Sequence, residues 1–383
     1  MDRRIFPLAL GALGIGTTEF VIMGLLPDVA KSLNISIPQA GHLISSYAFG
    51  VVVGAPILIA FAAKYPPKKI LSYLMIAFVI FNGLSALVND YYTMMIVRFL
   101  SGLPHGAFFG VGTVVATRLA KPGKQAQSIA MMFTGLTLAN LAMVPFVTWL
   151  GHQMSWRYAF GVVSVLGLLT LISLKFLLPY MDSLRTTTLK DELEFFKSAK
   201  AWHIIAITGI GFGGLFAWFS YITPLMTTVS RFDKDFIAYI MVLAGAGMVI
   251  GNFLGGVMAD KMRPALAAAI LLTAMILALI GVFFFSENQS VSLVLTFVCG
   301  ALSMAVGTPV NIMMLRSAKN SEMMAAAFMQ AAFNIGNSLG AFFGGLPLEF
   351  GLSYSYPSLV GAGLAGIGLF LCLAFMKKYK PVI

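Results

Sequence analysis

Twelve long apolar stretches follow one another along this chain of 383 residues, and they constrain its fold more than any other feature. A helix that crosses a bilayer needs about 20 mainly apolar residues. The predicted spans are residues 5–26, 39–62, 70–88, 91–117, 127–150, 158–179, 203–226, 235–259, 265–285, 290–315, 322–346 and 354–376. This pattern predicts an all-α membrane protein with twelve transmembrane helices. A first stretch within such a series favours a span over a cleaved signal peptide.

The composition is also that of a membrane protein. Apolar residues make up 59% of the chain and charged residues 10%, whereas soluble domains have about 45–50% and about 25%. The two cysteines, Cys299 and Cys372, fall in predicted helices. We expect them to pack in the core and not to form a disulfide or metal framework.

The net charge of +11 is distributed unevenly among the loops. Twenty of the 25 lysines and arginines fall at the two termini and in alternate loops, while the loops on the other side hold Lys31, Arg157, Arg231 and Lys234. Cytoplasmic loops of membrane proteins carry the basic excess, so both termini are predicted to be cytoplasmic, in a bacterial inner membrane. The charge therefore reflects topology, and no nucleic-acid partner is expected.

The longest hydrophilic stretch, residues 182–201, divides the chain into two parts of similar length. We predict six-helix bundles over residues 1–181 and 202–383, joined by this cytoplasmic linker. Apolar residues in the linker recur on one helical face, which predicts a short amphipathic helix at the membrane surface.

The two halves of the sequence can be superposed without gaps. A shift of 197 residues places Pro27 on Pro224, Gly50 on Gly247, Gly54 on Gly251 and Lys64 on Lys261, and a shift of 198 residues places Phe99 on Phe297, Gly102 on Gly300 and Arg118 on Arg316. A parallel six-helix repeat is typical of two-bundle transporters, whose substrate site lies near the bilayer midplane between the bundles. The bundles are predicted to be related by a pseudo-two-fold axis along the membrane normal.

Several segments resemble a known family of transporters. They are Gly-Ile-Gly-Thr-Thr-Glu-Phe at 14–20, Gly-His-Leu-Ile-Ser-Ser-Tyr at 41–47, Arg-Phe-Leu-Ser-Gly-Leu-Pro-His-Gly-Ala-Phe-Phe-Gly at 98–110, Phe-Ala-Trp-Phe-Ser-Tyr-Ile-Thr-Pro at 216–224 and Phe-Asn-Ile-Gly-Asn at 333–337. With them the chain resembles the major facilitator superfamily over essentially its full length. Within that superfamily it is most similar to the twelve-span drug:proton antiporters of the arabinose-efflux-permease-like branch. The resemblance implies transport by alternating access.

The cytoplasmic loop signature of that superfamily is present in one half and altered in the other. After the eighth span Asp260 and Lys261 match it, whereas after the second span its acid is replaced by Ala63 and Lys64 follows. The resemblance implies a cytoplasmic gate of Lys64, Asp260 and Lys261 in which Asp260 is the acid. The alternative is that Asp260 is a solvated loop residue.

One of the family's two antiporter motifs is present in this sequence and the other is degraded. In the fourth span Arg98, Gly102, His105 and Phe109 share one helical stripe, as the family's arginine motif does. In the fifth span the glycine-rich motif is degraded, because methionine and valine precede Pro145 where glycines would let helices approach closely. The first motif favours proton antiport and the second weakens that assignment.

Glu19 is the only one of the 14 acidic residues that lies deep in a predicted span. A charged side chain there costs about 2.5–3.5 kcal/mol by insertion scales, so it is a functional candidate. We expect Glu19 to carry the coupling proton or to pair with a cationic substrate; the alternative is an interhelical hydrogen bond. Arg98 either acts in function, by modulating Glu19, relaying protons or binding an anion, or donates to backbone carbonyls of the fifth span. His105 either titrates near neutral pH or packs in the helix bundle.

Other side chains of the spans are predicted to converge on a substrate cavity. They are Met23, Tyr47, Thr137, Asn140, Trp218, Tyr221, Gln330, Asn334 and Asn337. Amides and aromatic rings around an apolar cavity suit a small amphipathic ligand. The alternative is that the amides join helices and the rings pack in the core.

The function predicted from these features is proton-coupled efflux of small organic compounds, drugs or sugars, by alternating access. The alternatives are a sugar or metabolite exchanger or uptake facilitator without coupling through Glu19, and a non-transporting membrane sensor. No P-loop motif, nucleophile–base pair or metal-ligand cluster is visible in the sequence, so neither an ATP-driven pump nor an enzyme is expected. We expect no metal or cofactor, a proton gradient as the energy source, and a monomer in the lipid bilayer that binds a small-molecule substrate and protons.

Overall fold

The computed structural model describes residues 3–62, 65–122, 124–182, 197–317 and 322–379. Helices cover all twelve predicted spans, and eleven helical segments in these ranges are long and apolar enough to cross a membrane. The twelfth, α16 (Glu322–Glu349), has 28 residues, and the amide side chains in its middle lower its hydropathy. The amphipathic helix predicted for the linker falls on residues outside the described ranges.

The helices of the two sequence halves lie side by side. In the N-terminal half the predicted spans are α1 (Phe6–Gly24), α3 (Ile37–Ala62), α4 (Pro67–Ser85), α5 (Tyr91–Leu119), α6 (Gln125–Leu138) with α7 (Val144–Gln153), and α8 (Trp156–Leu177). In the C-terminal half they are α10 (Ala199–Gly211) with α11 (Gly213–Phe219), α13 (Ile237–Lys261), α14 (Pro264–Phe285), α15 (Gln289–Ser317), α16 and α17 (Tyr356–Lys378). The halves meet where α16 packs on α3 and α5 and where α13 packs on α7.

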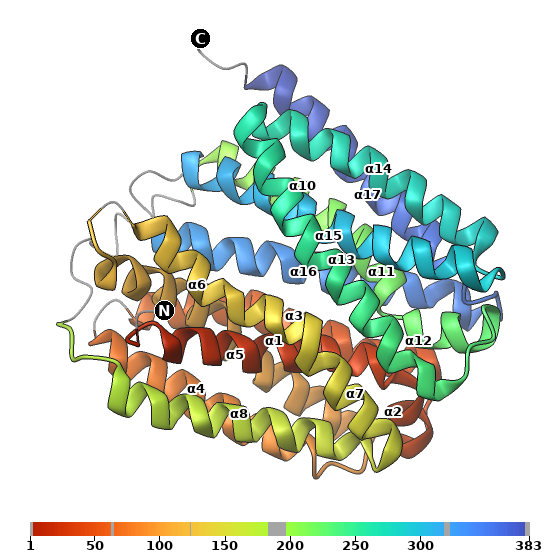
Figure 1. Cartoon of the computed structure of the whole chain (residues 1–383), viewed down its shortest axis with the longest axis horizontal. Helices are drawn as coiled ribbons and strands as arrows, with labels where there is room; N and C mark the ends of the chain where they lie inside the picture. The colour runs from red at the N-terminus through yellow and green to blue at the C-terminus, as the bar shows by residue number, and fades with distance from the viewer. Residues whose placement is uncertain (1–2, 63–64, 123, 183–196, 318–321, 380–383) are drawn as a thin grey trace.

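The molecule has two distinguishable ends (Figure 1). Helix α1 begins and α17 ends at one of them, which we call the open end. The short helices α2 (Leu26–Leu33) and α12 (Ile222–Pro224) lie with the last turn of α7 at the other, which we call the closed end. The names refer to the cavity described below.

Glycines allow helices to cross at equivalent places in both halves. A Cβ atom on Gly50 of α3 would lie 2.1 Å from the carbonyl oxygen of Phe99 on α5, and one on Gly247 of α13 would lie 2.3 Å from that of Phe297 on α15. These two pairs correspond under the shifts of 197 and 198 residues found in the sequence. The internal repeat is therefore matched by equivalent helix contacts.

Prolines interrupt the first span of each half. Leu25 separates α1 from α2 ahead of Pro27, and Ser220 and Tyr221 separate α11 from α12 ahead of Pro224. Proline has no N–H, so the carbonyl four residues before it loses its helical donor. The prediction of one continuous helix over 203–226 was therefore wrong.

The fifth span is one continuous helical segment, as predicted over 127–150, but its hydrogen-bonding pattern changes in the middle. A π-helical turn, η1 (Ala139–Met143), joins α6 to α7 just before Pro145. The proline ring cannot continue the regular hydrogen-bonding pattern, and π-helical turns are frequent at functional sites.

Candidate functional site

A cavity of about 350 Å³ lies between the two halves. Its lining residues come from α1, α5, α6 and η1 on one side and from α11, α13, α15 and α16 on the other. The lining extends from Glu19 on α1 to Leu315 in the last turn of α15, which runs toward the open end (Figure 1). The cavity therefore reaches from the middle of the molecule toward the open end.

The cavity wall is mainly apolar and contains a few polar groups. Five phenylalanines line it: Phe20, Phe133, Phe212, Phe216 and Phe333. Its polar lining residues are Glu19, Thr113, Thr137, Asn140, Asn252, Thr308, Asn311 and Gln330. An apolar wall with a few polar groups is typical of a site for a small organic ligand.

Glu19 is the one charged side chain among the lining residues of the described chain, and it is 6% exposed. Arg98 of the N-terminal half and Asn334 and Asn337 of α16 lie beside its carboxyl group. Both asparagines are buried, and the amide of Asn337 has no hydrogen-bond partner among the described residues. Glu19 thus lies where the cavity, the N-terminal half and α16 meet.

Arg98 is fully buried in the N-terminal half and does not line the cavity. Its Nη1 donates to Thr18 Oγ1 at 3.1 Å, and its Nη2 donates to the Thr18 carbonyl oxygen at 3.2 Å. The guanidinium carbon lies 4.3 Å from the centre of the Tyr47 ring, which is a cation–π contact. The carbonyl that Arg98 reaches belongs to α1 and not to the fifth span, so Arg98 ties α5 to α1 and α3.

Tyr47 of α3 and His105 of α5 form a polar cluster with Glu19 and Arg98. Tyr47 Oη and His105 Nδ1 are 3.1 Å apart, and both side chains are buried. Gln330, which lines the cavity, lies next to the imidazole. The cluster of Glu19, Arg98, Tyr47 and His105 therefore meets the cavity at two places. Glu19 lines it directly, and His105 lies next to Gln330, which lines it.

At the closed end the two halves are in direct contact. Thr223 on α12 donates to the carbonyl oxygen of Met23 at 2.9 Å, the carbonyl that Pro27 leaves without a helical donor. The hydroxyl of Ser45 on α3 donates to the carbonyl oxygen of Ser338 on α16 at 3.1 Å, and the Ser338 hydroxyl donates to that of Ser45 at 3.4 Å. These contacts shut the cavity at this end.

Three of the nine side chains predicted for the cavity line it: Thr137, Asn140 and Gln330. The other six are not among its lining residues: Met23, Tyr47, Trp218, Tyr221, Asn334 and Asn337. Met23 takes part in the contact just described, and Trp218 and Tyr221 are each 1% exposed. Tyr221 Oη donates to the carbonyl oxygen of Ala341 at 2.7 Å, and a Cβ atom on Gly41 of α3 would lie 2.2 Å from it. Tyr221 therefore fills the contact between α12, α16 and α3.

Two of the three predicted gate residues lie at the open end. Asp260 and Lys261 are exposed at the end of α13, and neither side chain forms a hydrogen bond or ion pair with the described part of the chain. Lys64 lies outside the described residues. The gate therefore stays a prediction.

Asp28 on α2 joins both halves at the closed end. Its carboxylate pairs with His152 Nε2 of α7 at 3.3 Å and with Lys234, which precedes α13. Burial raises the pKa of Asp28, but the neighbouring His152 and Lys234 outweigh this effect and hold the pKa below its usual value. Ionised Asp28 therefore stabilises the contact between the halves.

We expect Asp28→Asn to shift the closed end toward an open arrangement by a factor of a few, because a partly exposed ion pair contributes about 0–1 kcal/mol. The contribution is present above the usual carboxyl pKa and is lost as the pH falls through the lowered pKa. Spin-label distances between Lys31→Cys and Asn288→Cys, both exposed, measure the shift. Asp233→Asn, beside Lys234, is the control. If the spin-label distances at neutral pH are the same in Asp28→Asn as in wild type, Asp28 does not stabilise the closed end.

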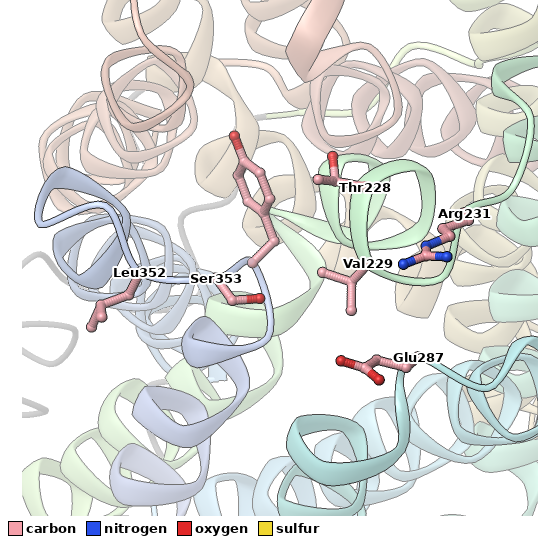
Figure 2. Close-up of a pocket in the computed structure, with 7 residues that line it drawn as sticks. Thr228, Val229, Arg231, Glu287, Leu352 and Ser353 are labelled. Carbon is pink, nitrogen blue, oxygen red and sulfur yellow. The ribbon is translucent and has the colours of Figure 1, made fainter.

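A second hollow, of about 540 Å³, lies within the C-terminal half at the closed end. Figure 2 shows Arg231 and Glu287 on one side of it and Leu352 and Ser353 on the other. All of its lining residues belong to the C-terminal half. Because it does not lie between the halves, we assign the candidate substrate site to the cavity beside Glu19.

Sequence reasoning missed several residues of these sites. Asn252, Thr308 and Asn311 could have been found, because each is a polar residue within an apolar span. The pairing of Asp28 with Lys234 carried no such signal, since the two residues are 206 positions apart. Only the packing of the two halves brings them together.

The chain is similar over its length to known transport proteins. Residues 8–341 match the sequence model of the Major Facilitator Superfamily. The protein AraJ of Escherichia coli strain K12 is 41% identical over 380 residues, which cover 99% of this chain and 96% of AraJ. A chloramphenicol resistance protein of Streptomyces lividans is 28% identical over 344 residues, which cover 89% of this chain and 88% of that protein.

The fold is also that of a solved transporter. The xylose transporter XylE of E. coli, in a partially occluded inward-open conformation, superposes with a TM-score of 0.79 over 99% of this chain and 97% of XylE. Its sequence identity is 16%, so the likeness shows the fold alone. The predicted fold class, twelve helices in two bundles of six, is confirmed.

Proposed function

This chain belongs to the Major Facilitator Superfamily, and from that membership we propose that it exports small organic compounds in exchange for protons. The observation that carries the proposal is Glu19, the one charged side chain that lines the described cavity. A carboxyl group within a membrane span is costly and typically marks a proton or ligand pathway. The relative named for chloramphenicol resistance supports efflux of organic compounds.

We place the open end in the cytoplasm and the closed end outside a bacterial inner membrane. The support is the basic excess at the termini and in the loops of the open end, since cytoplasmic loops carry such residues. The structure then corresponds to an inward-facing state. Its cavity would admit substrate from the cytoplasm.

In the proposed cycle residues 1–181 and 202–383 move as two bundles, so that the cavity faces each side in turn. A proton binds Glu19 when the cavity faces outward and leaves when substrate enters from the cytoplasm. Asn334 and Asn337 lie beside Glu19, so α16 is placed to respond to its protonation. Arg98, Tyr47 and His105 hold this region of α1, α3 and α5 in register.

Proton movement in everted membrane vesicles tests the proposal. Vesicles acidified inside by respiration would be followed with a pH-sensitive dye while chloramphenicol, tetraphenylphosphonium or L-arabinose is added. We expect at least one compound to release protons from vesicles that contain the protein and not from vesicles without it. Uptake of a labelled compound without proton movement would instead indicate an uncoupled exchanger or facilitator.

A further inference from the structure

We propose that Asn252, Thr308 and Asn311 form a polar subsite in the cavity wall that hydrogen-bonds an uncharged group of the substrate. The proposal rests on the proposed function and narrows its substrate class. The class is a compound with an aromatic body and an uncharged hydroxyl or amide group. The subsite is distinct from Glu19, since it belongs to α13 and α15 of the C-terminal half.

The three side chains form one group in the cavity wall. Thr308 Oγ1 donates to Asn252 Oδ1 at 3.1 Å, which joins α15 to α13. Asn311 follows Thr308 by three positions, so it lies on the same face of α15. Its Nδ2 donates to the carbonyl oxygen of Gly307 at 3.0 Å.

These bonds leave both a donor and an acceptor for a ligand. An asparagine amide has two N–H donors and one carbonyl acceptor. The Asn252 amide nitrogen and the Asn311 carbonyl oxygen make no hydrogen bond to the described part of the chain, yet both residues line the cavity. A hydroxyl or amide group, which both donates and accepts, complements this pair.

The internal repeat indicates that helix packing does not require the Asn252 amide or the Thr308 hydroxyl, whereas Asn311 corresponds to Thr113, which also lines the cavity. Under the shifts of 197 and 198 residues, Asn252 corresponds to Ala55 and Thr308 to Gly110. The equivalent helices α3 and α5 pack against each other in the same manner as α13 and α15 without polar side chains at those positions. The amide and hydroxyl are therefore specific to the C-terminal wall of the cavity.

The ionisable groups show the opposite asymmetry. Glu19 corresponds to Phe216, and Arg98 corresponds to Thr296. The N-terminal half thus holds the acid and its basic neighbour, together with the neutral lining residues Thr113, Thr137 and Asn140, while the polar lining residues of the C-terminal half are all neutral. A substrate bound at the second subsite can be uncharged and still lie in the same cavity as the proton-binding residue.

Aromatic rings supply the remaining contacts for such a substrate. Phe212 and Phe333 line the cavity with their ring centres 4.7 Å apart, and Phe133 lines it opposite them, in the N-terminal half. Aromatic pairs prefer such edge-to-face or offset contacts. The volume of about 350 Å³ lies within the usual range for drug-sized ligands.

Binding of two probes to the purified full-length protein in lipid nanodiscs tests the subsite. Chloramphenicol is uncharged and aromatic and carries hydroxyl and amide groups, whereas tetraphenylphosphonium is an aromatic cation without them. Asn252→Leu and Thr308→Val remove the polar groups with little change of volume. We expect each variant to weaken chloramphenicol binding about three- to tenfold, as the loss of one hydrogen bond implies, and to leave tetraphenylphosphonium binding unchanged.

Thr273→Val is the matched control, because Thr273 on α14 does not line the cavity and its hydroxyl donates to its own helix at Ala269. Unfolding temperatures establish that the variants are folded. Chloramphenicol affinities equal to wild type in both Asn252→Leu and Thr308→Val would overturn the subsite. If the wild-type protein binds tetraphenylphosphonium but not chloramphenicol, or binds neither probe, the proposed substrate class is overturned. The vesicle experiment decides proton coupling separately.

Discussion

Glu19→Gln is expected to reduce substrate-dependent proton movement to the level of vesicles without the protein. Glutamine keeps the size of the side chain and can hydrogen-bond to Asn334 and Asn337, but it cannot bind or release a proton. No other acidic side chain lines the cavity in the described chain, so no neighbour can take over the step. Substrate exchange does not need that step and should persist.

The two activities can be measured on the same preparations. Proton movement is followed in everted vesicles, and exchange is followed as counterflow of labelled chloramphenicol in liposomes without a pH gradient. Glu349→Gln makes the same change at an exposed acid at the end of α16 and should behave as wild type does. Proton movement that persists in Glu19→Gln would show that coupling lies elsewhere, with Glu19 serving as an interhelical hydrogen-bonding residue.

Gly245→Val is expected to shift the protein away from the arrangement with a shut closed end. A Cβ atom on Gly245 of α13 would lie 2.3 Å from the carbonyl oxygen of Asn140 in η1 of the other half. The contact is with backbone, so it cannot be relieved by a side-chain rotation. Overpacking of this kind costs about 1–3 kcal/mol, which changes the ratio of two conformations by about 5- to 150-fold.

Spin-label distances across the closed end should therefore lengthen in this variant. Gly256→Val provides the control, because Gly256 lies on the same helix and a Cβ atom there would meet nothing within 4 Å. Both changes are made in a background with Cys299→Ala and Cys372→Ala, so that only the introduced cysteines carry labels. Equal distance distributions in wild type and Gly245→Val would mean that α13 and η1 do not separate when the closed end opens.

The helix contacts within each half could be predicted from the repeat. Gly50 and Gly247 were aligned from sequence, and each lies where its helix crosses the backbone of another. A glycine that recurs at the same place in both halves carries this information because only its small side chain allows so close an approach. The continuity of the span over 203–226 was judged less well, since hydropathy does not register that Pro224 breaks the helical pattern.

The site could be predicted only in part. Glu19 was identifiable because a carboxyl group in an apolar span is costly. The partners of Arg98 were not, because helical periodicity shows which residues share a face but not which helix that face meets. For the same reason Trp218 and Tyr221 were assigned to the cavity, whereas they are buried outside its wall.

The sequence by itself determined the membrane class, the number of spans and the repeat, and it singled out Glu19 as the candidate for proton binding. These properties depend on local composition and spacing, which any packing of the helices retains. Only the tertiary structure decided which end of the cavity is shut and which side chains line it. Opening either end leaves the hydrogen bonds within the helices intact, so the choice rests on contacts between distant residues, such as Thr223 with Met23 and Asp28 with Lys234.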